Sequence, residues 1–208
     1  MEQETKAPNT APAFWNDRYS SYITVYGDEP NAFFKESLEK MPDGKLLLPA
    51  EGEGRNAIFA AMRGWHVHAF DYSPAARSKA LARAAENNLK INYSIADIND
   101  VILPSDEYDA VGLIYVHLEP EERKIFHRRI VKALKPGGHV ILEAFSKDQI
   151  KNISGGPRNE KQLYDLSDLE EDFKGLLFTV SRQERIRLNE GPFHQGTADV
   201  VRILATKL

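Results

Sequence analysis

The 208-residue chain contains no cysteine. Disulfides, thiolate zinc sites, iron–sulfur clusters and cysteine nucleophiles are therefore excluded. No stretch approaches the run of about 20 apolar residues that a membrane-spanning helix needs. The polar N-terminus, MEQETKAPNTAPA, lacks the apolar core of a secretory signal. We therefore expect a cytoplasmic protein that has no membrane partner.

A basic stripe is also missing from the sequence. Lys and Arg number 27 against 31 Asp and Glu, which gives a net charge of −4. This balance argues against nucleic acid as a partner and favours a small molecule. Apolar residues make up 42% of the chain, which is enough to fill a sizeable core. The length suits one α/β domain, in a monomer or a homodimer.

The composition changes near residue 14. Residues 1–13, rich in Pro, Thr and charge, are predicted to form a flexible tail, followed by a single domain over residues 14–208. Residues 31–40 have the apolar spacing of a helix. An aromatic cluster precedes this helix and consists of Trp15, Tyr19, Tyr22 and Tyr26.

From Lys45 onward, strand and helix patterns alternate, which is typical of βαβ units in a parallel sheet. The last two strands have only a short loop between them, so we expect them to pair antiparallel. The fold class predicted is α/β: a Rossmann-like, doubly wound, three-layer fold with a seven-stranded, mostly parallel sheet. The expected strands are 45–49, 66–70, 91–95, 108–114, 138–145, 176–188 and 198–206, and the expected helices are 55–63, 74–88, 120–134 and 167–173.

The run LLLPAEGEGRN, residues 46–56, is the most informative motif. It has the pattern of a buried strand that enters a glycine turn and then a helix. Gly52 and Gly54 provide backbone that a ligand can approach closely. Asp71 ends the next apolar run, where nucleotide-binding sheets place the carboxylate that holds the ribose. Turn, spacing and acid together indicate a nucleoside-cofactor site.

Further polar residues follow the other strands. In a doubly wound sheet, ligands lie beyond the carboxyl ends of the strands. The first four predicted strands are followed by residues 50–54, Asp71, Asp97 and residues 115–117. We therefore expect these residues to lie at one site.

The sequence resembles the class I S-adenosylmethionine (SAM)-dependent methyltransferases over about residues 14–208. The resemblance is carried by AEGEGRN, FDYS, IADIND, YDAVGLIYVHL and HRRIVKALKPGGHVILEAF. The stretch FWNDRYSSYITVYGDEPNAFF is similar to the N-terminal segment of tellurite-resistance and thiopurine-type methyltransferases. That likeness implies that residues 14–44 cover the cofactor.

The resemblance implies transfer of a methyl group from SAM to an unidentified small-molecule acceptor, with S-adenosylhomocysteine (SAH) as product. Asp71 would bind the ribose hydroxyls, unless it is an N-cap acid beside Ser73. Asp97 would bind the adenine amino group, unless it only forms an Asx turn. The cofactor-binding residues expected are Trp15, Ala50, Glu51, Gly52, Gly54, Asn56, Asp71, Tyr72, Asp97, Ile98, Ile114 and Tyr115.

The glycine turn departs from the family pattern, Asp-x-Gly-x-Gly-x-Gly, at two positions. Leu48 stands in place of the acid and Ala50 in place of the first glycine. Glu51 could return a carboxylate to the methionine ammonium. The departure leaves a non-catalytic SAM- or SAH-binding protein as an alternative function. An NAD-type oxidoreductase is a weaker alternative, because the full GxGxxG spacing is missing.

A catalytic base is needed only if the acceptor is protonated at neutral pH. The candidates are His117 after the fourth strand, Glu143 within the fifth, and His194 in the loop NEGPFHQGT. Each has a structural alternative, such as a helix cap or a buried hydrogen-bonded acid. The insertion 146–165 is long enough for a lid or a binding loop. No metal site is expected, because His66 and His68 lack a third ligand.

Overall fold

The computed structural model describes residues 12–20 and 24–208. Its first helix, α1, begins at Pro12, which corrects the predicted tail at its last two residues, since proline is favoured in the first turn of a helix. The rest of that tail, and Tyr22, lie outside the described residues. The helices are α1 (Pro12–Tyr19), α2 (Ala32–Leu38), α3 (Arg55–Met62), α4 (Pro74–Glu86), α5 (Pro120–Ala133) and α6 (Leu166–Asp172), with 3-10 turns η1 (Lys147–Lys151) and η2 (Glu160–Gln162).

Seven strands form one sheet in the order β3-β2-β1-β4-β5-β7-β6. The first five pair in parallel, and β7 runs antiparallel to both β5 and β6. The predicted fold class is thus confirmed. The strands are β1 (Lys45–Pro49), β2 (His66–Asp71), β3 (Asn92–Ile95), β4 (Tyr108–Ile114), β5 (Leu134–Phe145), β6 (Leu176–Asn189) and β7 (Gln195–Lys207).

Strand β5 begins four residues earlier than predicted. Leu134 pairs with Tyr108, whereas the next paired residue of β5, His139, lies opposite Ala110. The Lys-Pro-Gly-Gly turn is therefore a bulge within the strand, with Gly137 at φ 79°. The predicted strand began only after this turn, at residue 138, because Pro and Gly usually interrupt strands.

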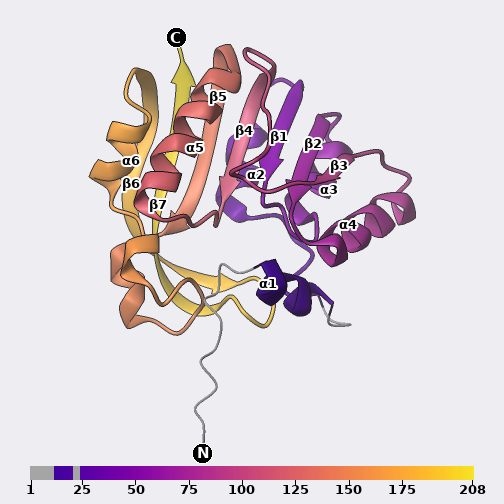
Figure 1. Ribbon diagram of the computed structural model, residues 1–208, viewed down its shortest axis with the longest axis horizontal. Coiled ribbons are helices and arrows are strands. Elements are labelled where there is room, and N and C mark those ends of the chain that lie inside the picture. The colour runs from indigo at the N-terminus through magenta and orange to yellow at the C-terminus, as the bar shows by residue number, and fades with distance from the viewer. Residues whose placement is uncertain (1–11, 21–23) are drawn as a thin grey trace, which may run out of the picture.

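Each face of the sheet carries its own core. Along β1, Leu47 belongs to the core that contains Phe126 of α5, whereas Leu46 and Leu48 belong to the core that contains Phe34 of α2. This alternation follows from the two-residue period of a strand. Helices α2, α3 and α4 thus cover one face, and α5 and α6 cover the other (Figure 1).

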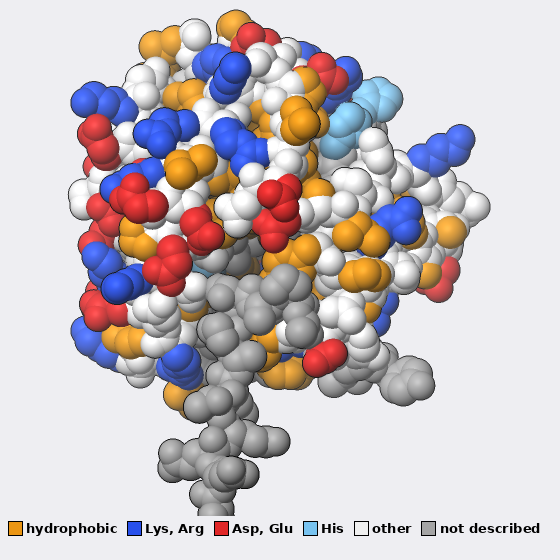
Figure 2. Space-filling view, in the orientation of Figure 1, with side chains coloured by type: hydrophobic (Ala, Val, Ile, Leu, Met, Phe, Trp, Pro, Cys, Tyr) orange, Lys and Arg blue, Asp and Glu red, His pale blue; other side chains and the backbone are white. Residues whose placement is uncertain are grey.

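Helix α1 lies below the edge of the sheet where the parallel strands end (Figure 1). The turn of the β6–β7 hairpin extends toward the same edge, so α1 and this hairpin lie at one edge of the sheet. On the face drawn in Figure 2, acidic and basic side chains are interspersed. In the described part of the chain, no helix is both long and apolar enough to cross a membrane.

Candidate functional site

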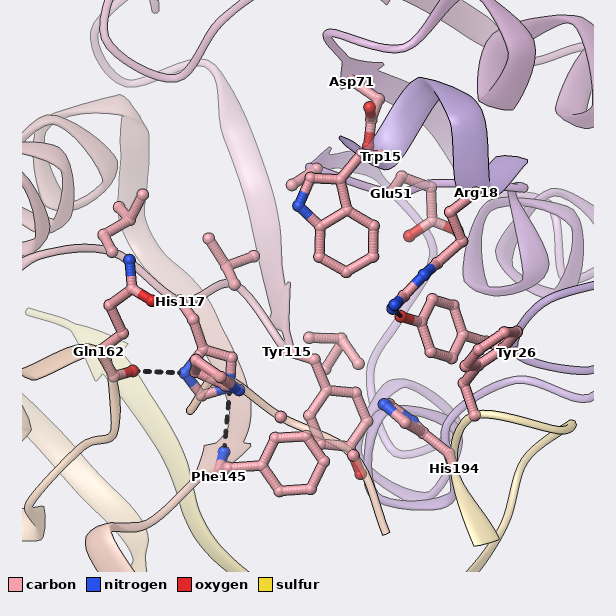
Figure 3. A pocket seen from close by; sticks show the side chains of 18 of the residues that line it. Trp15, Arg18, Tyr26, Glu51, Asp71, Tyr115, His117, Phe145, Gln162 and His194 are labelled. Carbon is pink, nitrogen blue, oxygen red and sulfur yellow. Dashed lines mark hydrogen bonds between the residues drawn. The ribbon is translucent and has the colours of Figure 1, made fainter. Parts of the chain in front are cut away.

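A cavity of about 660 Å³ is lined by residues from the carboxyl ends of the parallel strands and from α1. Its walls come from segments far apart in the sequence (Figure 3). Gly52, Gly54 and Glu143 do not line it. The other residues predicted from the sequence do: Trp15, Ala50, Glu51, Asn56, Asp71, Tyr72, Asp97, Ile98, Ile114, Tyr115, His117 and His194.

The glycine turn has a left-handed backbone at three positions. Ala50 has φ 49°, Gly52 has φ 63° and Gly54 has φ 83°. A Cβ added at Gly52 would lie 2.6 Å from the Tyr19 hydroxyl, and one at Gly54 would lie 2.7 Å from the Ala80 Cβ. Both glycines are therefore required by close packing as well as by conformation. Ala50 adopts the backbone conformation that glycine favours, at a modest energetic cost.

The Glu51 side chain is directed toward the start of α3, the helix that follows it. Its carboxylate accepts hydrogen bonds from the Ala57 backbone N–H at 2.7 Å and from the Asn56 amide at 3.2 Å. It thereby caps a helix whose N-cap residue, Gly54, has no side chain. Burial raises the pKa of Glu51 to about 7, although these hydrogen bonds oppose the rise. Glu51 also lines the cavity, where its ionised form could meet a cation.

Asp71 is buried at the end of β2. It accepts from the backbone N–H of Gly52 at 3.1 Å and of Ser73 at 2.9 Å, so it ties strand β2 to the glycine turn. Burial raises its pKa to about 6. The N-cap of α4 is Ser73, whose hydroxyl accepts from the Ala76 N–H. Asp71 is therefore not needed as a cap.

Asp97 forms an Asx turn after β3. One of its oxygens accepts from the Asn99 N–H at 2.8 Å. Its other oxygen has no hydrogen-bond partner among the described residues, and Asp97 lines the cavity beside Ile98. The turn and a ligand contact can therefore coexist.

The N-terminal segment is tied to the glycine turn. The Val25 N–H donates to Glu53 at 2.7 Å, and Trp15 stacks on Tyr19 with centroids 5.8 Å apart. The Arg18 guanidinium donates to the Tyr26 hydroxyl at 3.0 Å. Within residues 12–20 and 24–208, Arg18 has no carboxylate partner. Figure 3 shows its guanidinium on the side of Glu51.

Both ring nitrogens of His117 are in hydrogen bonds. Nε2 accepts from the Phe145 backbone N–H at 3.3 Å, so Nδ1 carries the proton and donates to the Gln162 carbonyl at 2.7 Å (Figure 3). Burial lowers the pKa of His117 to about 4. The ring is neutral and holds two backbone segments together, which leaves no nitrogen for an acceptor proton.

Among the described residues, only one ring nitrogen of His194 has a hydrogen-bond partner. Its Nδ1 lies 3.2 Å from Glu190, whose other partners include the Arg55 guanidinium at 3.0 Å. Burial tends to raise the pKa of Glu190, but His194 and Arg55 hold it below its usual range. Glu190 is thus ionised, and Nδ1 must be the donor. Burial lowers the pKa of His194, so at neutral pH its Nε2 holds a lone pair.

Glu143 is fully buried within β5. Its carboxylate accepts from the Asn31 amide at 2.6 Å, the Tyr115 hydroxyl at 2.7 Å and Arg202 at 2.5 Å. With these partners it anchors Tyr115, a non-glycine residue at φ 54°, in the cavity wall.

Sequence reasoning missed several residues that shape the site. Arg18 follows Trp15 by three residues, a spacing that places both on one side of a helix. Glu190 precedes His194 by four residues, yet only the hairpin turn brings them together. Arg55 begins α3 and Phe145 ends β5, and nothing in the sequence pattern indicated that either would shape the site.

The comparisons with known proteins agree with this geometry. Residues 49–138 match the family model described as a methyltransferase domain. A ubiquinone biosynthesis O-methyltransferase of Rickettsia bellii (strain OSU 85-389) is 32% identical over 122 residues, which are 58% of this chain and 50% of that protein. The chain spans half or less of the length of the first curated relatives that it matches.

Two solved structures share the fold at low sequence identity. TehB from Haemophilus influenzae has a TM-score of 0.72 and 17% identity, over 95% of this chain and 67% of that one. Phosphoethanolamine N-methyltransferase 2 of Haemonchus contortus, in complex with S-adenosyl-L-methionine, has a TM-score of 0.66 and 16% identity, over 96% of this chain and 58% of that one. Residues 49–138 thus match a methyltransferase domain, and the fold of the chain resembles that of TehB.

Proposed function

We propose that this protein transfers the methyl group of SAM to a small-molecule acceptor. One observation carries the proposal. The cavity joins a left-handed glycine turn and a buried strand-end acid, Asp71, to a second region that contains a half-bonded histidine, His194. The methyltransferase domain match and the SAM complex of a protein with the same fold support the cofactor.

The residues of the cavity fit each part of SAM. Asp71 would accept hydrogen bonds from the ribose hydroxyls, and the free oxygen of Asp97 would accept from the adenine amino group. Glu51 would pair with the methionine ammonium, and Arg18 with its carboxylate. The rings of Trp15 and its neighbours suit a sulfonium cation.

His194 is the base that the geometry favours over His117 and Glu143. When bound, SAM supplies a methyl carbon for attack by the acceptor heteroatom, and the electron pair of the broken bond stays on sulfur. His194 Nε2 takes the proton that the acceptor loses, and Glu190 stabilises the imidazolium that forms. The site has to align acceptor and methyl group at about 3–3.5 Å.

The alternative of a non-catalytic binding protein rests on Leu48 and Ala50. Leu48 is wholly buried in the core, away from the cavity. Ala50 retains the left-handed backbone of the turn. We therefore favour a working site over a degenerate one.

The test is methyl transfer from methyl-labelled SAM to a panel of thiols, phenols and amines. We expect turnover by the wild type and a loss of about a hundredfold or more in the His194→Gln variant, with SAH affinity kept. SAM binding without turnover on any acceptor would favour the non-catalytic alternative. Binding of NADH in place of SAM would refute the proposal.

A further inference from the structure

The part of the cavity away from the glycine turn is aromatic. We call it the acceptor subsite and define it by Tyr115, His117, Phe145, Phe193 and His194, all of which line the cavity. These residues come from the ends of β4 and β5 and from the β6–β7 hairpin. In Figure 3 the rings of Tyr115, His117, Phe145 and His194 lie together, apart from Asp71 and Glu51.

Three of these rings form a continuous wall. Phe145 stacks on Tyr115 with centroids 4.7 Å apart and planes at 27°, and on His117 at 5.6 Å and 14°. The His194 ring meets Tyr115 and Phe145 edge-on, at 4.7 and 5.4 Å. Such a wall offers π-faces and edges that suit another flat ring.

No charge in the acceptor subsite is left to meet a charged ligand. His117 and His194 are neutral at neutral pH, since burial lowers both pKa values. The nearby carboxylate of Glu190 is already paired with Arg55. The Arg18 guanidinium lies over the Phe193 ring, 4.6 Å from its centroid, at the border of the acceptor subsite, and it is the group proposed above to pair with the methionine carboxylate of SAM. An ionic group placed here would lose hydration without gaining a counter-charge.

Two glycines bring the 146–165 segment directly against this wall. A Cβ at Gly155 would lie 2.7 Å from the His194 ring, and one at Gly156 would lie 2.8 Å from the Phe145 ring. Both have positive φ, 127° and 88°. The mouth continues the apolar character, with Ile153 91% exposed and Phe193 43% exposed. Exposed apolar side chains at the rim of a cavity are a common sign of a binding site.

We propose that the acceptor is an uncharged, largely apolar molecule with a flat ring, and that it carries a thiol or hydroxyl whose proton passes to His194. The heteroatom forms its new bond to the methyl carbon and loses its proton to Nε2, so the neutral acceptor becomes a neutral methyl ether or thioether. This inference rests on the proposed function and names the acceptor class for the same site.

A matched pair of probes tests the proposal. Phenylmethanethiol is neutral at pH 7.5, and 4-(sulfanylmethyl)benzoate has the same ring and thiol with one added carboxylate. SAH binding is measured first, by calorimetry, and its absence would refute the proposed function itself. With SAH bound, we expect phenylmethanethiol to bind about tenfold or more tightly than the carboxylate, and kcat/KM with SAM to follow the same order.

Phosphoethanolamine serves as a charged probe that has no ring. Equal or better binding of the carboxylate or of phosphoethanolamine would overturn the acceptor class while leaving the cofactor assignment intact. Failure of phenylmethanethiol to bind the SAH-loaded protein at millimolar concentration would overturn it as well.

Substitution of the loop glycines provides a second test. In Gly156→Ala the new methyl group displaces the Phe145 ring, so phenylmethanethiol binding should weaken about fivefold or more, with the SAH dissociation constant unchanged. Gly175→Ala is the matched control, because Gly175 has φ 94° but nothing within 4 Å of its added Cβ. Unchanged thiol binding in a folded Gly156→Ala variant would contradict a subsite formed by Phe145.

Discussion

At the scale of single residues, the turn AEGEGRN has a glycine-like backbone conformation at a position that is not glycine. Ala50 lies where the family has glycine, yet its φ of 49° is one that glycine adopts freely and alanine adopts at a cost of about 1 kcal/mol. Gly52 and Gly54 cannot be replaced by alanine in the same way, because Tyr19 and Ala80 occupy the space that a Cβ would need. The turn therefore has a left-handed backbone at Ala50 as well as at its two glycines.

Asp71 is predicted to be the principal ribose ligand. Replacement by alanine removes a buried acceptor of charge-assisted hydrogen bonds, so Asp71→Ala should weaken SAM binding by about tenfold or more. The measurement is titration calorimetry, with circular dichroism to show that the variant is folded. Asp28→Asn, at an exposed acid, is the control. An unchanged dissociation constant in folded Asp71→Ala would remove Asp71 from the site.

Glu51 makes the protein sensitive to pH. Its pKa is raised from 4.5 to about 7 by burial, so between these values the folded apo protein retains a proton that the unfolded chain has lost. The apo protein therefore loses stability relative to Glu51→Gln as the pH rises from 4.5 to 7. Urea unfolding of both proteins at several pH values measures this difference, and parallel curves would contradict it.

Ionisation of Glu51 is also predicted to affect SAM binding: as the pH rises, the stability of the apo protein falls but its affinity for SAM increases. The ionised form pairs with the methionine ammonium, so wild-type affinity should rise about tenfold between pH 5.5 and pH 8. Asp71, whose pKa is about 6, adds to the rise. In Glu51→Gln the rise should shrink. A wild-type affinity that is flat over this range would exclude a bound ammonium at Glu51.

At the scale of elements, β5 joins the core to the cavity through Glu143. Removal of this carboxylate leaves the Tyr115 hydroxyl without its acceptor, leaves the Asn31 amide with its longer bond of 3.3 Å to Glu190, and weakens the pairing of Arg202. Glu143→Ala should therefore lower the free energy of unfolding by about 3 kcal/mol. Chemical denaturation measures this. The exposed acid Glu36 is the control, and its replacement by alanine should leave stability unchanged.

The strands and the strand-end residues could be predicted from the sequence because each depends on local patterns. Apolar runs with turn residues define β1 to β4, and parallel strands bring their carboxyl ends to one edge. The extent of β5 could not be predicted, since Pro136 and Gly137 lie in a bulge that only the pairing with β4 reveals. The roles of the histidines could not be predicted either. Both nitrogens of His117 are bonded because Gln162 and Phe145, which are distant in sequence, approach its ring, and His194 is bonded on Nδ1 because the hairpin turn brings Glu190 to it.

At the scale of the whole molecule, the cavity is assembled from both ends of the chain. Helix α1 and the β6–β7 hairpin meet below the sheet edge, where Tyr26 contacts His194 with ring centroids 4.4 Å apart. The regions proposed for cofactor and acceptor are thus parts of one cavity, and Trp15, Arg18 and Tyr26 of the N-terminal segment line it. A ligand that fills the cavity should stabilise the fold as a unit by mass action.

The measurement that tests this account most directly is calorimetric titration of the full chain with SAM, SAH and NADH under the same conditions. We predict one site that binds SAM and SAH, with the affinity for both reduced in Asp71→Ala, and no binding of NADH. Binding of NADH without SAM or SAH would contradict the central claim that this cavity is a methyltransferase cofactor site.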